Sequence, residues 1–327
     1  MRTLAFVGGS KVEVRQVPDP VPDPGQLLIR IRNSAICGSE LHGYRNGAPT
    51  NGGHELVGEV VEANAVDAFR PGDRVIVSVM SNGCGRCYWC LSGDPKYCPA
   101  LKTLWGGHGD YFVAPANSCC ILPEDIPFES GVLLGGDFVG TSYRAIKRTG
   151  VTALDSVLVI GAGPIGLGVL SILRYRGLQV IVSEPSAYRR DLCARAGAIV
   201  FDPATTDLLA ATNELTAGLG PTVVFDCVGR PATQTLALDI ARPKGKVCYI
   251  GENNELTINP SRQIIHKELR LVGSVYFTLP DFQEIIALYR QGYRPEPFAT
   301  HRYTLEEADL AYRTFAAGNT GKVLFSY

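Results

Sequence analysis

The sequence predicts an α/β protein in which a doubly wound parallel sheet is joined to a second, β-rich domain. Residues 157–275 alternate short apolar runs with helical patterns, which is typical of a parallel sheet covered on both faces. Residues 1–135 instead alternate short β-branched runs with Pro/Gly turns, which indicates antiparallel strands. The chain has 327 residues, about twice the usual length of one domain, so we expect two domains.

The order of these patterns divides the chain into three segments. Residues 1–138 carry the antiparallel patterns and include a four-cysteine lobe at 84–98. Residues 139–275 carry the parallel-sheet patterns. Residues 276–327 contain two helical stretches, a capping box at Thr304 and Glu307, and a closing strand KVLFSY. This last segment is too short to fold alone, so we expect it to return to the first domain.

The composition excludes several classes of protein. Apolar residues make up 46% of the chain and charged residues 19%, so it is neither disordered nor a coiled coil. The 31 basic and 32 acidic residues give a net charge of −1, without the positive charge that nucleic acids or acidic membrane surfaces attract. The uncharged stretch 156–173 approaches the length of a membrane span, but its glycines and proline fit a strand, a turn and a helix better. We therefore expect a small-molecule partner, no nucleic acid and no membrane.

The first residues and the cysteines predict a cytoplasmic protein. The opening segment MRTLAFVGG lacks the apolar stretch and the cleavage site of a signal peptide. In a reducing compartment, clustered cysteines among the ten in the chain indicate metal binding or catalysis before they indicate disulfides.

The lobe has the cysteine spacing of a structural metal site. Its four thiols are those of Cys84, Cys87, Cys90 and Cys98. A tetrahedral site of four thiolates leaves no open position for a substrate, and zinc prefers such a site, although iron could use the same ligands. Free or redox-active thiols are the alternative. Only Arg86 and Lys96 supply positive charge within the lobe, which disfavours a nucleic-acid-binding zinc ribbon.

A glycine-rich turn predicts a dinucleotide site in the second domain. The sequence Gly161-Ala162-Gly163-Pro164-Ile165-Gly166 directly follows the apolar run VLVI and opens a helix. The first glycine allows a tight turn, the second lets the backbone approach a pyrophosphate, and the third lets the helix pack closely on the strand. The phosphates would then lie at a helix N-terminus, where free N–H groups favour an anion.

Glu184, at the end of the next strand, indicates which dinucleotide binds. Its carboxylate would accept hydrogen bonds from both ribose hydroxyls and would repel a 2′-phosphate, so NAD is favoured over NADP. Arg189 and Arg190 follow closely and could offset this repulsion. The alternative is a glycine-rich turn beside an ordinary surface glutamate.

Two segments of the first domain carry candidate ligands of a catalytic metal. Cys37 follows the run LLIRIRNSAI, and His54 stands with Glu55 at the start of the next strand. A catalytic zinc needs three protein ligands and one open position, and Cys37 and His54 can supply two of the three.

With these motifs the chain resembles the zinc-dependent medium-chain alcohol dehydrogenases over essentially its whole length. The resemblance rests on the metal-ligand segments, the lobe, the glycine-rich turn and the late segments FDCVG, KELRLVGS and HRYTLEEADLAY. It implies a GroES-like β-barrel catalytic domain and a Rossmann domain. It also implies two zinc ions per chain and assembly into a homodimer or homotetramer.

The resemblance also implies roles for individual residues. By position, Asp137 is the third zinc ligand and Glu55 the runner-up; a helix cap is the alternative role for Asp137. Ser39 and His42 match the proton relay of the family, and Thr141 matches the residue behind the nicotinamide ring.

Other positions are less well defined by the resemblance. Glu40 stands where an aspartate commonly orients the ligand histidine, so its hydrogen bond to His54 is in question. Met80 matches a substrate-pocket position, and Tyr44 and Asn46 follow His42 closely enough to line the same pocket. The polar residues near this pocket, Asn46, Ser81 and Asn82, favour a polyhydroxylated substrate.

The function that the resemblance implies is hydride transfer between NAD(H) and a secondary alcohol, a polyol or a sugar-derived hydroxyl. A zinc-free quinone or enoyl reductase of the same fold would have little use for Cys37, His54 and the lobe. A non-catalytic NAD- and zinc-binding protein would not need Ser39 and His42. The remaining cysteines and histidines are interpreted mainly as structural. For His108, which lies close to Trp105 in the sequence, a place at the edge of the active cleft is the alternative.

Overall fold

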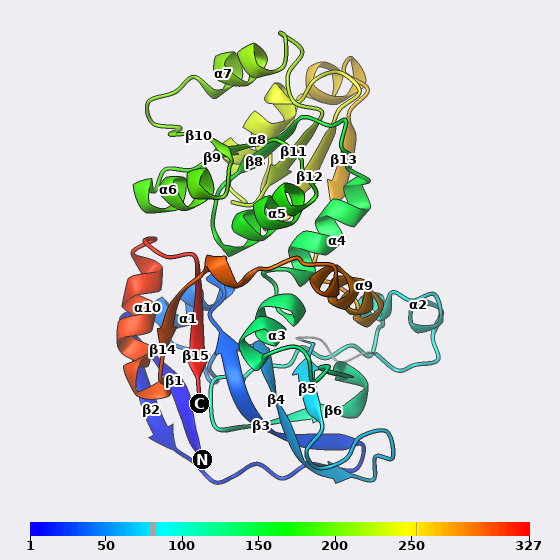
Figure 1. Cartoon of the computed structure of the whole chain (residues 1–327), viewed down its shortest axis with the longest axis vertical. Helices are drawn as coiled ribbons and strands as arrows, with labels where there is room; N and C mark the ends of the chain where they lie inside the picture. The colour runs from blue at the N-terminus through cyan, green and yellow to red at the C-terminus, as the bar shows by residue number, and fades with distance from the viewer. Residues whose placement is uncertain (79–82, 253) are drawn as a thin grey trace. The chain divides into compact units, whose positions relative to one another are not determined.

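The computed structural model describes residues 1–78, 83–252 and 254–327. Contacts between residues divide the chain into two compact units, drawn in Figure 1. The first unit contains residues 1–140 and 278–327, and the second contains residues 141–277. The first unit is therefore built from both ends of the chain.

The first unit is organised around a seven-stranded sheet. Its strands, in spatial order, are β14 (Ala299–Tyr303), β15 (Lys322–Ser326), β3 (Gln26–Ala35), β4 (Glu55–Asn64), β5 (Arg74–Val77) and β7 (Cys119–Ile121), with β6 (Tyr111–Pro115) paired to β3. All of these pairs are antiparallel except β14 with β15. Within the described residues the pairings trace an open path, so a β-rich domain is observed and a closed barrel is not.

Alternating apolar residues place one face of this sheet in a core. Leu27, Ile29 and Ile31 of β3 are almost fully buried and pack with Val75 of β5 and Phe112 of β6. Successive side chains of a strand point to opposite faces, so the period of two in the sequence selects this buried face.

The remaining elements of the first unit surround the sheet. A hairpin is formed by β1 (Arg2–Gly8) and β2 (Lys11–Gln16). The helices are α1 (Leu41–Asn46), α2 (Tyr88–Leu91), α3 (Phe128–Gly135), α9 (Leu279–Arg290) and α10 (Ala308–Ala316). Short 3₁₀ turns are η1 (Gly38–Glu40), η2 (Pro95–Tyr97), η3 (Ala116–Ser118), η5 (Glu296–Phe298) and η6 (Leu305–Glu307). The predicted capping box of Thr304 and Glu307 is present at the start of η6.

The second unit contains a six-stranded sheet in which every pair is parallel. Its strands lie in the order β10 (Ile199–Phe201), β9 (Val180–Ser183), β8 (Val157–Ile160), β11 (Val223–Asp226), β12 (Lys246–Tyr249) and β13 (Arg270–Gly273). The helical segments of this unit are α4 (Gly140–Thr149), α5 (Pro164–Tyr175), α6 (Ala187–Arg195), α7 (Leu208–Leu215), α8 (Pro231–Ile240) and the π-helical turn η4 (Pro260–Ile265). The first strand of this unit, β8, lies in the middle of the sheet. The next two strands are added on one side of it and the last three on the other, as in doubly wound dinucleotide-binding sheets. In such sheets ligands bind at the carboxyl ends of the strands where the side changes, between β8 and β11.

The uncharged stretch at 156–173 folds as a strand, a turn and a helix. It comprises β8, the glycine-rich turn and most of α5. Among the residues that the structure describes, no helix is both long and apolar enough to cross a bilayer.

Candidate functional site

Four side chains that can bind a metal converge in the first unit. They are Cys37, His54, Glu55 and Asp137, and one ligand atom of each lies within 4.8 Å of those of the others. Asp137 Oδ2 lies 3.5 Å from Cys37 Sγ and 3.2 Å from His54 Nε2. The structure thus brings the predicted thiol, imidazole and carboxylate together.

Strand register and a glycine explain this convergence. Ala35 at the end of β3 is paired with Glu55 at the start of β4, so Cys37 and His54 leave neighbouring strands at the same edge. Asp137 follows α3 and reaches the cluster past Gly136. A Cβ atom on Gly136 would lie 2.2 Å from Glu55 Oε2 and 2.6 Å from the backbone carbonyl oxygen of Val132, so glycine permits this approach where a larger residue would clash.

His54 is buried and its ring is held from both sides. Its Nδ1 lies 2.7 Å from the carbonyl oxygen of Gly52, and Trp105 contacts the ring edge-on at a centroid distance of 5.2 Å. Because a carbonyl oxygen only accepts, Nδ1 carries the hydrogen and Nε2 is the nitrogen directed to the cluster. Burial alone would lower the pKa of His54, but hydrogen bonds to Asp137 and Cys37 raise it well above its usual value. The thiol and the carboxylate beside the ring thus favour a cation at this point, and a bound metal ion would take the place of the proton.

Both carboxylate oxygens of Glu55 are committed within the protein. Oε2 accepts the backbone N–H of Asp137 at 2.9 Å, and Oε1 forms an ion pair with Lys322. Both side chains of this pair are at most 1% exposed. The carboxylate of Asp137 faces Cys37 and His54 directly, so Asp137 fits a third ligand position better than Glu55.

Glu40 does not orient His54. Its Oε1 accepts the backbone N–H of Cys37 at 2.9 Å, while its Oε2 is hydrogen-bonded to His108 and Tyr312. The acceptor for the Nδ1–H of His54 is the Gly52 carbonyl oxygen, and not the carboxylate of Glu40. A glutamate is one methylene longer than an aspartate, and the extra length carries the carboxylate away to these other partners.

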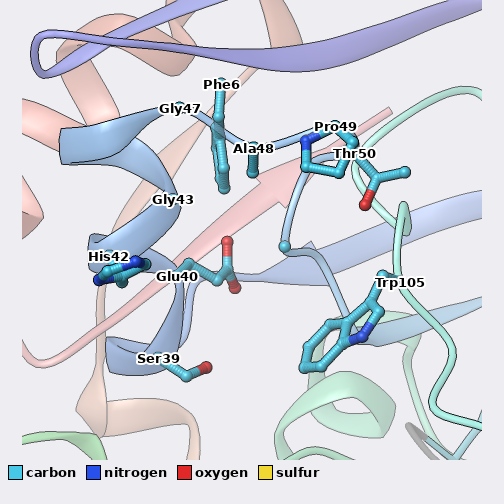
Figure 2. Close-up of a pocket in the computed structure, with 11 residues that line it drawn as sticks. Phe6, Ser39, Glu40, His42, Gly43, Gly47, Ala48, Pro49, Thr50 and Trp105 are labelled. Atoms are coloured by element: carbon cyan, nitrogen blue, oxygen red, sulfur yellow. The ribbon is translucent and has the colours of Figure 1, made fainter.

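A cavity of about 410 Å³ lies beside the cluster, and Ser39 and His42 both line it, as Figure 2 shows. The opposite part of its wall is mainly apolar and includes Phe6, Ala48, Pro49, Thr50 and Trp105. Trp105 connects the cavity to the cluster because the same ring contacts His54. A substrate hydroxyl near Ser39 would therefore have an apolar surface beside it.

The structure places other predicted pocket residues elsewhere. Tyr44 is 2% exposed and its ring stacks on that of Tyr312, so it belongs to the core and is absent from the cavity lining. Asn46 points its Nδ2 at Nδ1 of His42, at 3.2 Å. The predictions for Met80, Ser81 and Asn82 fall on residues 79–82, outside the described residues.

The lobe brings its four thiols together. The sulfur atoms of Cys84, Cys87, Cys90 and Cys98 lie within 4.8 Å of one another. Backbone N–H groups of Cys84 and Ala100 lie 3.3 and 3.4 Å from Sγ of Cys98, so amide hydrogens point at the sulfur. Gly83 has φ +68°, and a Cβ there would lie 2.7 Å from Cys90 Sγ. Glycine at this position lets the chain turn tightly around the thiols.

The glycine-rich turn has the geometry that each glycine predicts. Gly161 has φ +87°, and a Cβ on Gly166 would lie 1.8 Å from the carbonyl oxygen of Gly161. A Cβ on Gly163 would meet nothing within 4 Å, so the backbone there faces open space. Pro164 and Ile165 begin α5, as the sequence predicts.

Glu184 is buried directly behind this turn. Its two carboxylate oxygens accept the backbone N–H groups of Ala162 at 2.7 Å and Ser186 at 2.8 Å. Each oxygen keeps a second lone pair for a ligand hydroxyl. Arg190 is paired with Asp202 at 3.0 Å.

Two further predicted cofactor residues lie in the second unit. Arg189 lies in α6, and burial lowers its pKa. Thr141 is 6% exposed at the start of α4.

Near the cluster the sequence singles out neither Tyr312 nor Lys322, and it gives His108 a mainly structural interpretation. His108 and Tyr312 lie 68 and 272 residues from Glu40 along the chain, so no local spacing connects them. Lys322 opens the apolar strand KVLFSY, and the structure shows that it is buried and paired with Glu55, as a buried charge requires.

Comparisons with known proteins agree with this geometry. Residues 23–124 match the alcohol dehydrogenase GroES-like domain, and residues 164–291 match the zinc-binding dehydrogenase domain. An L-threonine 3-dehydrogenase of Pyrococcus furiosus is 33% identical over 99% of this chain and 97% of its own length. A sorbitol dehydrogenase of Halalkalibacterium halodurans is 30% identical over 98% and 96%. A solved Escherichia coli short chain alcohol dehydrogenase complexed with NADH is 26% identical, with TM-score 0.90 over 100% of this chain and 99% of that one.

Proposed function

The chain belongs to the zinc-type alcohol dehydrogenases, and from this premise we propose that it transfers a hydride between NAD(H) and a secondary alcohol or polyol. Cys37, His54 and Asp137 hold the catalytic zinc ion in this proposal. The observation that carries it is the convergence of these three donors beside the cavity of Ser39 and His42.

The donor set fits zinc. Thiolate, imidazole and carboxylate are the three kinds of side chain that bind Zn²⁺, and three protein ligands leave a fourth position for a substrate oxygen. A zinc ion bound there would polarise the substrate hydroxyl and lower its pKa. Asp137 is chosen over Glu55 because Lys322 and the backbone of Asp137 already occupy the Glu55 carboxylate.

Ser39 and His42 move the hydroxyl proton. A serine hydroxyl both donates and accepts, so Oγ of Ser39 can accept the substrate proton while it passes its own on. His42 is exposed at the cavity, so its ring nitrogens can pass a proton between Ser39 and water. The apolar wall formed by Phe6, Ala48 and Trp105 packs against the substituent of the substrate.

The second unit binds the dinucleotide. NAD supplies the nicotinamide that accepts the hydride. The N-terminus of α5 at Gly163 would hold its pyrophosphate, and Glu184 would accept hydrogen bonds from its ribose hydroxyls. The buried carboxylate of Glu184 supports NAD as the preferred cofactor, and Thr141 is assigned to the nicotinamide end.

The lobe holds a second, structural zinc ion. The four sulfur atoms lie close enough together to bind one ion, and with zinc they would form a closed tetrahedral site. Apart from Cys98, the described residues from 83 to 98 are not buried, so the segment has almost no core of its own. Metal binding in such a segment supplies the free energy that holds its fold.

We also retain the proposals of a closed barrel and of a homodimer or homotetramer. Strand β13 supports the second proposal, because it forms one edge of the parallel sheet and Leu271 on it is 43% exposed.

Zinc content and cofactor binding test the proposed function together. The unaltered protein is expected to hold two zinc ions and to reduce NAD with a secondary alcohol or polyol in a panel of substrates. Cys37→Ala is expected to abolish turnover and to leave NADH binding, followed by fluorescence, within about twofold. Cys120→Ala is the matched control, because its thiol belongs to neither cluster. Loss of NADH binding with intact turnover would contradict the assignment.

A further inference from the structure

A continuous network of hydrogen-bonded side chains adjoins the cluster of candidate metal ligands. It connects Tyr327, Ser34, His108, Glu40 and Tyr312. Tyr327 Oη lies 2.8 Å from Ser34 Oγ, which lies 2.8 Å from His108 Nδ1; His108 Nε2 lies 2.9 Å from Glu40 Oε2. The side chains of His108 and Glu40 are 0% exposed. The bond between His108 and Glu40 is therefore shielded from bulk solvent.

The chemistry of the groups sets the direction of each bond. The Glu40 carboxylate accepts from Tyr312 and from His108, so His108 carries its hydrogen on Nε2. His108 Nδ1 must then accept from the hydroxyl of Ser34, and Ser34 accepts from Tyr327. Every donated hydrogen in the network has an acceptor. The other carboxylate oxygen of Glu40, Oε1, accepts the backbone N–H of Cys37 at 2.9 Å.

The backbone of His108 is bonded to the segment that carries His54. Its N–H donates to Asn51 Oδ1 at 3.0 Å, and its carbonyl accepts from Asn51 Nδ2 at 3.1 Å. Asn51 Oδ1 also accepts the N–H of Gly53 at 3.2 Å, and Gly107 N–H donates to the Gly53 carbonyl at 2.8 Å. His108 thus reaches both segments that supply metal ligands.

We infer that His108 is a positioning residue of the metal site: its imidazole holds the Cys37 segment through Glu40, and its backbone holds the His54 segment through Asn51. This inference rests on the proposed function, because it assumes that the two segments bind one ion. A fully buried imidazole is costly to desolvate, and a core that required only volume would place an apolar ring there. Hydrogen bonds around a site that orient its ligands typically contribute ten- to a hundredfold to metal affinity.

Metal retention at Cys37 tests this inference independently of turnover. Zinc-loaded protein is exposed to increasing chelator and then to iodoacetamide, and alkylation of each cysteine is measured by peptide mass spectrometry. A thiol bound to metal resists alkylation, so Cys37 reports the cluster while Cys84 and Cys98 report the lobe. For His108→Phe, the chelator concentration that exposes Cys37 is expected to fall about ten- to a hundredfold, with the lobe unchanged.

The conservative variant separates hydrogen bonding from packing. His108→Gln keeps one N–H donor toward Glu40 and one acceptor toward Ser34, so we expect Cys37 protection within a few-fold of the unaltered protein. Tyr312→Phe removes one hydroxyl and keeps the ring, so a smaller loss in the same direction is expected even if His108→Phe fails to fold. Tyr303→Phe is its control, because the Tyr303 hydroxyl bonds Thr314 and does not belong to the network.

The outcomes distinguish this inference from the proposed function. Equal protection of Cys37 in the unaltered protein, His108→Phe and Tyr312→Phe would overturn the inference and leave the zinc site in place. A Gln variant as weak as the Phe variant would also overturn it, because packing would then explain the loss. No zinc-dependent protection of Cys37 in the unaltered protein would overturn both.

Discussion

Lys322 and Glu55 form an ion pair from which solvent is excluded on both sides. The lysine comes from β15, near the end of the chain, and the glutamate opens β4 beside His54. The cluster otherwise contains the thiol of Cys37 and the carboxylate of Asp137, so Lys322 balances one of its negative charges. Glu55 in turn fixes the backbone of Asp137 through its second oxygen. The pair therefore fixes the backbone of Asp137, the proposed metal ligand.

Removal of this lysine should destabilise the fold strongly. Lys322→Met leaves a buried carboxylate without its cation, which typically costs about 3–5 kcal/mol in the free energy of unfolding. Urea unfolding followed by circular dichroism measures the change. Lys244→Met is the control, because Lys244 and its partner Glu268 are 80% and 70% exposed. A loss no larger than in this control would show that Glu55 does not need the pair. Lys322→Met combined with Glu55→Gln should recover part of the loss.

The cysteines should differ in reactivity once the metal is removed. Hydrogen bonds from the backbone of Arg86 and Cys87 lower the pKa of Cys84 to about 6, whereas burial raises the pKa of Cys248 to about 12. Because the thiolate is the nucleophile, Cys84 should react with iodoacetamide at pH 7 more than a thousand times faster than Cys248.

The two cysteines should also differ in how their labelling rates depend on pH. Labelling of Cys84 should be constant above about pH 7 and should fall about tenfold per pH unit below pH 6, because protonation removes the thiolate. Labelling of Cys248 should still be rising at pH 9. Mass spectrometry of labelled peptides measures both rates. A Cys84 rate that keeps rising through pH 8 to 9 would contradict the assigned hydrogen bonds.

Glu184 should affect both cofactor choice and the stability of the glycine-rich turn. Glu184→Ala removes the acceptor of two backbone N–H groups and the proposed partner of the ribose hydroxyls. We expect NADH affinity to fall about tenfold or more, with NADPH affected less, because hydrogen bonds to a charged group contribute about 1.5–3 kcal/mol. Fluorescence titration with both cofactors measures the ratio. Glu214→Ala, at an exposed glutamate of α7, should leave the ratio unchanged. An unaltered ratio in Glu184→Ala would remove Glu184 from cofactor recognition.

Local patterns were sufficient for much of the architecture. Each apolar run from VLVI to LRLVG forms a strand of the parallel sheet, because a buried strand needs only a few consecutive apolar residues between turns. Cys37 and His54 meet because each leaves the same edge of the β3–β4 pair. Residues that follow or precede neighbouring strands in this way can be predicted from their positions in the sequence.

Partner choice inside the core could not be predicted in the same way. Glu40 bonds His108 and Tyr312, and both come from distant parts of the chain. The Glu40 carboxylate bonds these residues and not His54, and spacing along the sequence does not encode contacts between segments so far apart. Tyr44 was placed in the pocket from its position after His42, but α1 turns its ring into the core against Tyr312.

Trp105 should control the size of substrate that the cavity accepts. Its ring forms part of the wall of the 410 Å³ cavity and contacts His54 edge-on, while 44% of the residue remains exposed. Trp105→Ala removes a large apolar surface next to the proposed position of the substrate hydroxyl. The ratio of kcat/KM for bulky against small secondary alcohols should rise about tenfold or more, since even one methylene in an apolar pocket changes this ratio about tenfold. Trp89→Ala is the matched control, because Trp89 is exposed on the lobe and does not line the cavity. If both variants change the ratio equally, or neither does, the substrate does not bind against this wall.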